Sequence, residues 1–359
     1  MPSRGSRKSQ TCKEGSSLPS FLLRAVAFER SRLKLIDQTE LPTRIHHVYP
    51  RSAAETAKAI ERLAVRGAPS IGVAAAYGIV VESLRLPDNR LRQGLRKAAL
   101  TLVQARPTAV NLGWAVERMK RILASAPPDP GALRKALLAE ARRIEAEEIT
   151  NSRMLAEHGA KLLPQGAKVL TICNTGALAA PGLGTALGVI FRAHLKGKRP
   201  QVFACETRPL LQGARLTALE LARAHIPCTL IVDSAAATVM PECDLAIVGA
   251  DRIARNGDFA NKVGTRMLAI IARRYHKPFY VAAPSSTFDL DCATGKDIIV
   301  EQRSAEEVTE ITGRRTAPKG TKVFNPAFDV TQADLVKAFI TEKGIIRPPF
   351  RKNISRKIH

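Results

Sequence analysis

The spacing of hydrophobic and polar positions changes near the middle of the chain, and this change divides the sequence into two regions. In the first region, hydrophobic and polar residues alternate between residues 27 and 37, which is typical of a β-hairpin. Hydrophobic residues then recur with helical spacing. The helices that this spacing predicts cover residues 52–64, from 69 through 77, 91–104, 110–124 and 131–158. We therefore expect a mainly helical N-terminal domain with a small β-hairpin element.

From Lys168 onward, short hydrophobic runs alternate with helix-like stretches. The expected strands are residues 169–173, 201–205, 228–232, 245–248 and 279–282, and the expected helices are 184–193, 216–224 and 265–275. This alternation predicts an α/β fold with a Rossmann-like, doubly wound and mostly parallel sheet. We place the helical domain at residues 25–145 and the Rossmann-like catalytic domain at residues 146–345. The remaining ends are predicted to be a basic disordered extension (1–24) and a basic tail (346–359).

The chain is strongly basic, with 56 Lys and Arg against 32 Asp and Glu and a formal net charge of +24. Half of this surplus lies in residues 1–36 and 343–359, which have the composition of solvated, poorly ordered tails. A nucleic-acid-binding protein would interleave basic residues with aromatic ones or contain a known binding module. Aromatic residues make up only 4% of this chain and no such module is present, so nucleic acid is not an expected partner.

The six cysteines are scattered and form no C-x-x-C pair, which argues against a zinc site or a disulfide framework. No uninterrupted apolar run reaches about 18 residues, so no transmembrane helix is expected. The first 24 residues have the Arg- and Ser-rich composition of a transit peptide, but Glu14 and the lack of an amphipathic stripe weaken that interpretation. We expect a cytoplasmic protein without contact to a membrane.

Two segments have the composition of an anion site. In Arg66-Gly67-Ala68-Pro69, small residues and a proline at a helix start leave backbone N–H groups free beside a guanidinium, which suits a phosphate. An ordinary Gly-Pro helix entry explains the same residues equally well. Arg106 precedes Pro107 in a similar arrangement, although an arginine beside a proline is common on protein surfaces.

Other polar residues follow predicted strands, where ligands of open parallel sheets bind. Cys173 ends one strand, and its thiol is either a buried small hydrophobe or a reactive group. Asp251 ends an apolar strand, where burial favours a protonated carboxyl that is suited to acid catalysis. Asn261 and Lys262 offer an amide and an ammonium to hydroxyls or phosphate. The glycines at 182, 184 and 188 lack the spacing and position of a dinucleotide-binding turn, which argues against a nicotinamide site.

Taken together, the motifs resemble the methylthioribose-1-phosphate isomerase family, which is related to the α, β and δ regulatory subunits of a translation-initiation nucleotide-exchange factor. The similarity extends from about Leu33 to Ile345. It rests on RGAPSIG, RPTAVNL, ICNTGALA, ETRPLLQGARLTA and GADRIARNGDFANKVGT, the last being the most specific. Both basic ends lie outside the resemblance, and the stretch at 233–236 matches the family loosely.

The resemblance implies an aldose–ketose isomerase of methionine salvage that works without a metal or organic cofactor. It implies Cys173 and Asp251 as the catalytic pair, and a small sugar phosphate as the substrate. The substrate contacts that it implies are Arg66, Gly67, Ala68, Arg106, Gln212, Asn261 and Lys262. We also expect the chain to form a homodimer.

The expected reaction starts from a sugar 1-phosphate, whose anomeric oxygen is esterified and which therefore cannot open as a free aldose does. Asp251 would protonate the ring oxygen as a general acid, and Cys173 would assist the transfer of hydrogen from C2 to C1. Two alternatives remain open. One is an isomerase acting on ribose 1,5-bisphosphate or 5-deoxyribose 1-phosphate, and the other is a non-catalytic regulatory subunit. The presence of both Cys173 and Asp251 in complete motifs favours an enzyme.

Overall fold

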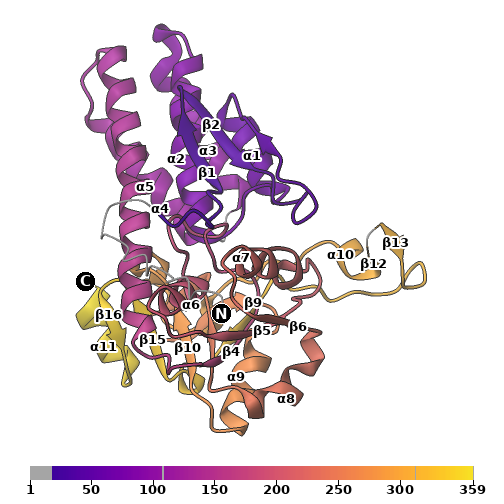
Figure 1. Ribbon diagram of the computed structural model, residues 1–359. Coiled ribbons are helices and arrows are strands. Elements are labelled where there is room, and N and C mark those ends of the chain that lie inside the picture. The colour runs from indigo at the N-terminus through magenta and orange to yellow at the C-terminus, as the bar shows by residue number, and fades with distance from the viewer. Residues whose placement is uncertain (1–17, 107–108, 312, 359) are drawn as a thin grey trace, which may run out of the picture.

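The helical half of the molecule matches the pattern of the first region. The computed structural model describes residues 18–106, 109–311 and 313–358. Strands β1 (Val26–Glu29) and β2 (Arg32–Ile36) form an antiparallel hairpin, and β3 (His47–Val48) pairs with β2. The predicted helices are all present as α1 (Ala53–Glu61), α2 (Ala68–Arg85), α3 (Leu91–Ala105), α4 (Val110–Ser125) and α5 (Pro130–Ala160). The prediction of a helical N-terminal part with a small hairpin is confirmed (Figure 1).

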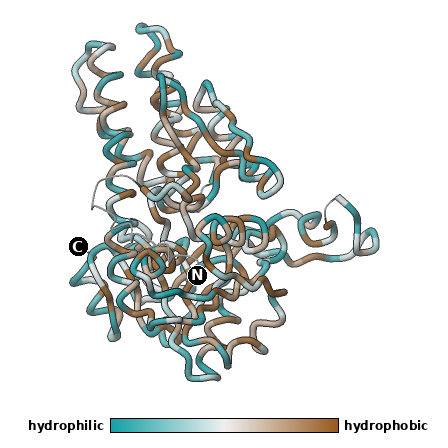
Figure 2. The backbone as a smooth tube through the Cα atoms, in the orientation of Figure 1, coloured by the Kyte–Doolittle hydropathy of each residue, from teal (hydrophilic) through white to brown (hydrophobic). Residues whose placement is uncertain are grey.

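Helix α2 is the centre of this half because nearly all of its faces are apolar. Its residues from Ala68 through Ser83 are buried, and it packs against α1, α3, α4 and α5. A helix that is hydrophobic all round has to be enclosed by other elements. The surrounding helices expose charged side chains to solvent, although α5 also buries Glu140, Glu145 and Glu148. The hydrophobic stretches of the chain gather in the interior (Figure 2).

The second half contains a seven-stranded sheet in the order β16-β15-β10-β7-β4-β5-β6. Six of these strands are parallel, and only the edge strand β16 runs antiparallel. The sheet is built from β4 (Lys168–Thr171), β5 (Gln201–Cys205), β6 (Cys228–Ile231), β7 (Leu245–Val248), β10 (Phe279–Ala282), β15 (Ala338–Thr341) and β16 (Gly344–Ile346). The connecting helices are α6 (Ala186–Leu195), α7 (Ala218–Arg223), α8 (Ala236–Val239) and α9 (Thr265–Arg274). The predicted mostly parallel α/β fold is confirmed.

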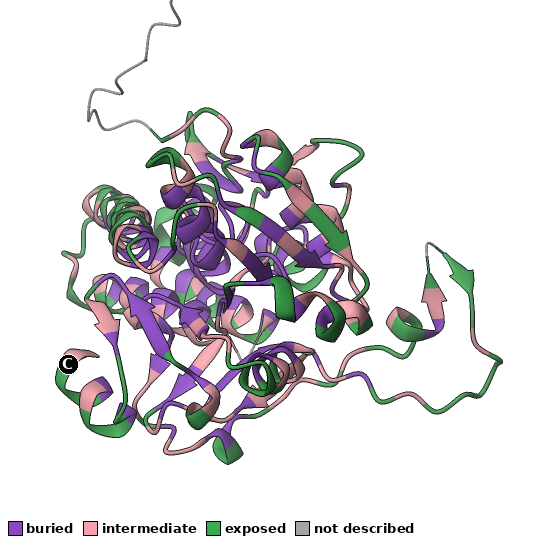
Figure 3. Ribbon diagram, turned by 60° about the horizontal axis from the view of Figure 1, so that its bottom comes forward, coloured by how far each residue is buried: buried purple, intermediate pink, exposed green. Residues whose placement is uncertain are grey.

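A second, smaller sheet was not predicted. It has the order β11-β8-β9-β14 and consists of β8 (Arg252–Ala254), β9 (Phe259–Lys262), β11 (Phe288–Asp289) and β14 (Phe328–Thr331). Between β11 and β14, an arm that carries α10 (Glu306–Thr309), β12 (Glu310–Ile311) and β13 (Arg314–Arg315) extends away from the body of the molecule (Figure 3). Strand β9 of this sheet ends at Lys262, one of the substrate contacts that the resemblance implies.

The expectation of poorly ordered ends is wrong where the structure describes them. Helix α11 (Phe350–Ile358) contacts β16 and buries Phe350 and Ile354 in the core of the sheet domain. At the other end, Leu23 is buried and the Phe21 ring packs edge-on against a core phenylalanine of α6. Apolar residues spaced by four positions anchor α11 in spite of its charge. Residues 1–17 of the predicted extension lie outside the described part of the chain.

Helix α5 connects the two halves, since it starts among the N-terminal helices and ends against α6 and β15 (Figure 1). It passes through the predicted boundary at residues 145 and 146 without interruption, so the two predicted domains share one rigid element. Among the described residues, no helix combines the length and the apolar character that crossing a bilayer requires.

Candidate active site

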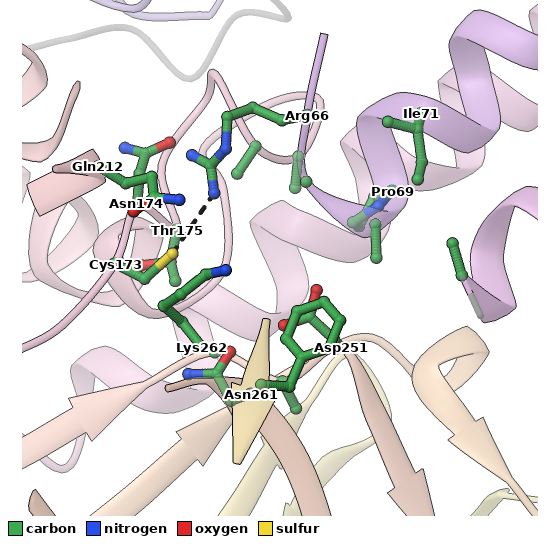
Figure 4. Close-up of a pocket in the computed structure, with 18 of the residues that line it drawn as sticks. Arg66, Pro69, Ile71, Cys173, Asn174, Thr175, Gln212, Asp251, Asn261 and Lys262 are labelled. Atoms are coloured by element: carbon green, nitrogen blue, oxygen red, sulfur yellow. Dashed lines mark hydrogen bonds between the residues drawn. The ribbon is translucent and has the colours of Figure 1, made fainter. Parts of the chain in front are cut away.

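A pocket between the helical half and the carboxyl ends of the parallel strands collects all the residues that the sequence singled out. Its lining includes Arg66, Gly67, Ala68, Arg106, Cys173, Gln212, Asp251, Asn261 and Lys262. These residues come from the start of α2, the end of α3, the ends of β4, β7 and β9, and the loop after β5. Figure 4 shows Cys173, Lys262 and Asp251 around one space, with Arg66 reaching in from the α2 side.

The start of α2 has the properties of an anion site. Gly67 has a φ of +87°, and a Cβ there would lie 2.2 Å from the carbonyl oxygen of Ala179. That carbonyl accepts the Ser70 N–H at 3.2 Å, so glycine is needed for the helix to approach the Cys173 loop. The N–H groups of Gly67 and Ala68 have no acceptor among the described residues, and both residues belong to the pocket lining. Free N–H groups at a helix start attract an anion.

Two arginines add positive charge to this region. Arg66 Nη2 lies 3.4 Å from Cys173 Sγ, and its Nη1 is buried without a hydrogen-bond partner in the described structure. Arg106 lies 3.6 Å from the carboxylate of Glu301, and burial lowers the pKa of its guanidinium. The Arg106 Nε atom is also buried without a partner among the described residues. Buried polar groups are normally paired, so these donors are available to water or to a polar ligand.

Two side-chain acceptors on the Arg66 side of the pocket also lack partners in the described structure (Figure 4). The side-chain oxygens of Asn174 and Gln212 are buried and have no donor within the described part of the protein. Gln212 directly precedes a π-helical turn at Gly213–Thr217, a form often found at functional sites. A ligand that offers both hydroxyl donors and an anionic group satisfies these acceptors together with the arginine donors.

Cys173 is held in an unusual backbone conformation after the end of β4. Its φ of +68° lies in the left-handed region, which a non-glycine residue occupies only when its surroundings hold it there. The Cys173 N–H donates to Thr207 Oγ1 at 2.8 Å, and the Cys173 carbonyl accepts from Thr217 Oγ1 at 2.7 Å. Thr207 itself has a φ of +69°. Backbone strain therefore accompanies the placement of the thiol in the pocket.

Asp251 and Lys262 form the charged centre of the pocket. Asp251 follows β7, and its N–H donates to the carbonyl of Ala260 at 2.9 Å. Burial raises the pKa of the Asp251 carboxyl, although Lys262, Arg106 and Arg66 oppose this shift. Burial also lowers the pKa of Lys262, whose Nζ donates to the carbonyl of Ala327 at 2.8 Å. A carboxyl that keeps its proton is suited to donate it to a substrate.

The small second sheet positions the end of β9. Residue Lys262 pairs with Phe328 of β14, and its Nζ lies 5.0 Å from the centre of the Phe328 ring. The neighbouring Asn261 is buried, and its amide donates to Thr265 Oγ1 at 2.8 Å. This arrangement fixes both side chains before a ligand binds.

Sequence analysis missed several lining residues. Asn174 and Thr175 lie inside a motif that it quoted, whereas Thr185 and Arg303 carried no recognisable signal. Arg303 reaches the pocket from the base of the arm and pairs with Glu301, which also faces Arg106. The two residues that follow Arg106, Pro107 and Thr108, lie outside the described residues.

The one candidate metal-ligand group among the described residues lies outside the pocket lining. Among the described residues, the group of His, Cys, Asp and Glu side chains close enough to hold an ion is Asp37, Glu40 and His46. None of the three lines the pocket, and Asp37 already forms an ion pair with Arg62 at 2.7 Å.

This chain resembles one protein family, both in a family model and in individual relatives. Residues 64–348 match the model of the initiation factor 2 subunit family. The chain is 50% identical to a methylthioribose-1-phosphate isomerase of Pelotomaculum thermopropionicum, covering 91% of each chain. It is 48% identical to a protein of that name from Desulforamulus reducens, over 93% of this chain and 98% of that one.

Two solved structures resemble the whole fold. The 5-methylthioribose 1-phosphate isomerase of Pyrococcus horikoshii OT3 superposes with a TM-score of 0.86 at 40% identity, covering 93% of this chain and 95% of that chain. A structure from A. fulgidus titled as translation initiation factor eIF-2B, subunit delta, has a TM-score of 0.84 at 43% identity, covering 94% and 99%.

Proposed function

Because the chain belongs to the initiation factor 2 subunit family, within its methylthioribose-1-phosphate isomerase group, we propose that it catalyses the isomerisation of 5-methylthioribose 1-phosphate to 5-methylthioribulose 1-phosphate, a step of methionine salvage. One observation carries the proposal. A buried thiol, a carboxyl with a raised pKa, and cationic and N–H donors that lack partners among the described residues belong to the lining of one pocket. These groups match the acid, the hydrogen-transfer assistant and the phosphate site that the reaction requires.

The phosphate of the substrate is proposed to bind at the start of α2. The N–H groups of Gly67 and Ala68 and the guanidinium groups of Arg66 and Arg106 supply the donors. The sugar hydroxyls would then face Gln212 and Asn261, and the ammonium of Lys262 would lie beside the reacting carbons. Charge-assisted hydrogen bonds of this kind are stronger than neutral ones, so they fix the orientation of the sugar.

Asp251 is the proposed general acid. Its proton would pass to the ring oxygen as the C1–O bond of the ring breaks, and the phosphate ester at C1 would stay intact. Because burial raises the Asp251 pKa, the carboxyl holds this proton at a higher pH than an exposed aspartate does. The positive charge of Lys262 then stabilises the carboxylate that remains.

Cys173 is proposed to assist the second stage, in which hydrogen moves from C2 to C1. Two routes are compatible with a thiol at this position: removal of the C2 proton through an enolate-like intermediate, and a direct hydride shift beside the thiol. Turnover in deuterated water separates them, because solvent deuterium at C1 of the product requires an exchanging proton. A product without deuterium favours the hydride shift.

A sister isomerase acting on ribose 1,5-bisphosphate or 5-deoxyribose 1-phosphate would use the same chemistry. Arg66 and Arg106 of the helical half are proposed to hold the phosphate at C1, whereas the other lining residues of this half, Leu63, Ile71 and Ala109, are apolar and offer no charge to a second phosphate. This composition favours the methylthio substituent over a 5-phosphate.

A regulatory subunit is the second candidate function, since a structure titled as a translation-factor subunit is 43% identical to this chain. A purely scaffolding subunit has no need for a strained Cys173 in the same pocket as a half-buried Asp251. The test is direct turnover: purified protein is incubated with 5-methylthioribose 1-phosphate, and the ketose is detected by NMR. Conversion that depends on Cys173 supports the enzyme, and a lack of conversion at high enzyme concentration supports the regulatory candidate.

We further propose that the chain forms a homodimer. Strand β6 is an edge strand of the large sheet, and an edge presents backbone groups that can pair with another chain. Leu230 at this edge is 47% exposed, and Val232 just beyond it is 54% exposed. Covering both side chains with a second copy would remove apolar surface from water.

A further inference from the structure

A buried carboxylate lies beneath the loop that carries the proposed catalytic thiol. Glu220 of α7 is only 2% exposed, and it does not form an ion pair with any described residue. Its Oε2 accepts the side-chain amide of Asn174 at 2.6 Å, and its Oε1 accepts the N–H of Leu178 at 3.2 Å. Gly176 packs so closely that a Cβ there would lie 2.3 Å from Oε2. Burying a carboxyl without a cation is costly, so an unpaired one inside a core requires an explanation.

The hydrogen bonds of the Glu220 carboxylate all go to one segment, the Asn174–Leu178 loop, which directly follows Cys173. Thr217, at the end of the π-helical turn just before α7, also holds Cys173, because its Oγ1 donates to the Cys173 carbonyl at 2.7 Å. Beyond the loop, Ala179 accepts the Ser70 N–H at the start of α2. Glu220 is thus attached to the segment that links the thiol to the proposed phosphate site.

We infer that Glu220 is a positioning residue for the proposed isomerase, and that its ionised carboxylate fixes the Asn174–Leu178 loop so that Cys173 keeps its strained conformation in the pocket. The inference rests on the proposed function. The groups that face the carboxylate are donors, and two carboxylate oxygens accept them without conflict. A protonated carboxyl has an O–H donor that would point at another donor, so protonation releases part of the loop.

The charge state of Glu220 is sensitive to pH in the neutral range. Burial raises the pKa of Glu220 to about 7, while the bonds from Asn174 and Leu178 and the charge of Arg66 favour ionisation. Among the described residues, the charged group that favours ionisation of Glu220 is Arg66. The titratable group next to the loop is Cys173, which lies beside Arg66. As the pH rises through about 7, Glu220 is expected to lose its proton, and the carboxylate then fixes the Asn174–Leu178 loop.

The test compares Glu220→Gln, Glu220→Asp and Glu148→Gln in the full chain. Glu148 is a matched control, because it is a buried glutamate whose pKa is also raised to about 7 by burial but which does not contact the loop. We expect Glu220→Gln to lower kcat by about 10-fold or more and to lose the rise of kcat with pH near neutrality. Glu220→Asp should recover part of kcat and retain that rise. Glu148→Gln should keep kcat within about two-fold of the wild type.

A second measurement needs no substrate. The rate at which iodoacetamide alkylates Cys173 is followed by peptide mass spectrometry, and release of the loop should increase it about five-fold or more in Glu220→Gln but not in Glu148→Gln. A wild-type alkylation rate in Glu220→Gln, or an equal loss of kcat in both Gln variants, would overturn the inference. An inactive wild type with the expected alkylation difference would instead refute the proposed function alone.

Discussion

At the scale of single residues, the account depends on how burial changes the chemistry of Asp251. The carboxyl follows a buried strand and faces Lys262, Arg106 and Arg66, yet burial outweighs these charges and raises its pKa. A general acid needs a proton to donate, and burial of the Asp251 carboxyl favours its protonated form. Activity that depends on the protonated acid should fall as the pH rises above this raised pKa.

Replacement of the acid tests this directly. Asp251→Asn keeps the shape of the side chain but cannot donate a carboxyl proton, so we expect kcat to fall about 10²- to 10⁴-fold. Folding should be unaffected or slightly more stable, since the desolvated carboxyl is gone. Steady-state kinetics and thermal unfolding measure both effects. The control is Glu206→Gln, which changes a carboxylate that follows β5 and lies outside the pocket lining. If Glu206→Gln lost kcat to a similar extent, the specific role of Asp251 would be contradicted.

The phosphate site makes a second prediction at this scale. Gly67→Ala places a Cβ 2.2 Å from the Ala179 carbonyl oxygen at a φ of +87°, so the start of α2 must shift away from the Cys173 loop. We expect KM to rise about 10-fold or more, together with a lower melting temperature. Gly166→Ala imposes a similar positive φ where nothing lies within 4 Å, so it should affect stability alone. Equal KM values in the two variants would exclude the assigned phosphate site.

At the scale of elements, α5 joins the halves and carries a buried carboxyl at their junction. Burial is the main cause that raises the pKa of Glu148 to about 7, and the nearby Glu342 and Glu147 add to it. Between about pH 4.5 and 7 the folded protein therefore keeps a proton that the unfolded chain has released. The unfolding free energy that this proton contributes decreases as the pH rises through that window.

Glu148→Gln should remove this pH dependence. Relative to the wild type, the variant is expected to gain stability as the pH increases from 5 to 8, by about 2 °C or more in melting temperature. Thermal unfolding monitored by circular dichroism at four pH values measures the difference. Parallel melting curves for the two proteins across this range would show that Glu148 does not hold the proton.

Some elements and site residues could be predicted from the sequence, and others could not. Cys173 and Asp251 were found because β4 and β7 are long-range neighbours in a parallel sheet, and a general rule places ligands at such strand ends. The sheet that holds Lys262 was missed because its strands have two to four residues, and β9 pairs with β14 across some 66 positions of sequence. Helix α11 was mistaken for a tail because its charge concealed the buried Phe350 and Ile354. Arg303 reaches the pocket only through the fold of the arm.

At the scale of the whole molecule, the basic charge is distributed between the pocket and the surface. Arg66, Arg106 and Lys262 have a specific proposed ligand, a sugar phosphate, whereas many other basic residues are exposed or form surface ion pairs. A basic surface also attracts anionic substrates over longer distances. The charge of the chain is thus compatible with a small ligand and does not require a nucleic acid.

The proposed homodimer is tested by charge insertion at the sheet edge. Leu230→Glu places a carboxylate at an exposed position of β6, and we expect it to convert a dimer into a monomer in sedimentation velocity. Leu100→Glu changes another exposed leucine, on α3, and should leave the dimer intact. A dimer that survives Leu230→Glu would locate the interface elsewhere, and a monomeric wild type would contradict the homodimer.

The most direct test of the account measures kcat/KM for two substrates side by side. Wild type and Asp251→Asn are each given 5-methylthioribose 1-phosphate and ribose 1,5-bisphosphate, and the ketose products are quantified by NMR. The account predicts that the wild type prefers 5-methylthioribose 1-phosphate by at least about 100-fold and that Asp251→Asn loses this activity. Equal or better turnover of the bisphosphate, or full activity in Asp251→Asn, would contradict it.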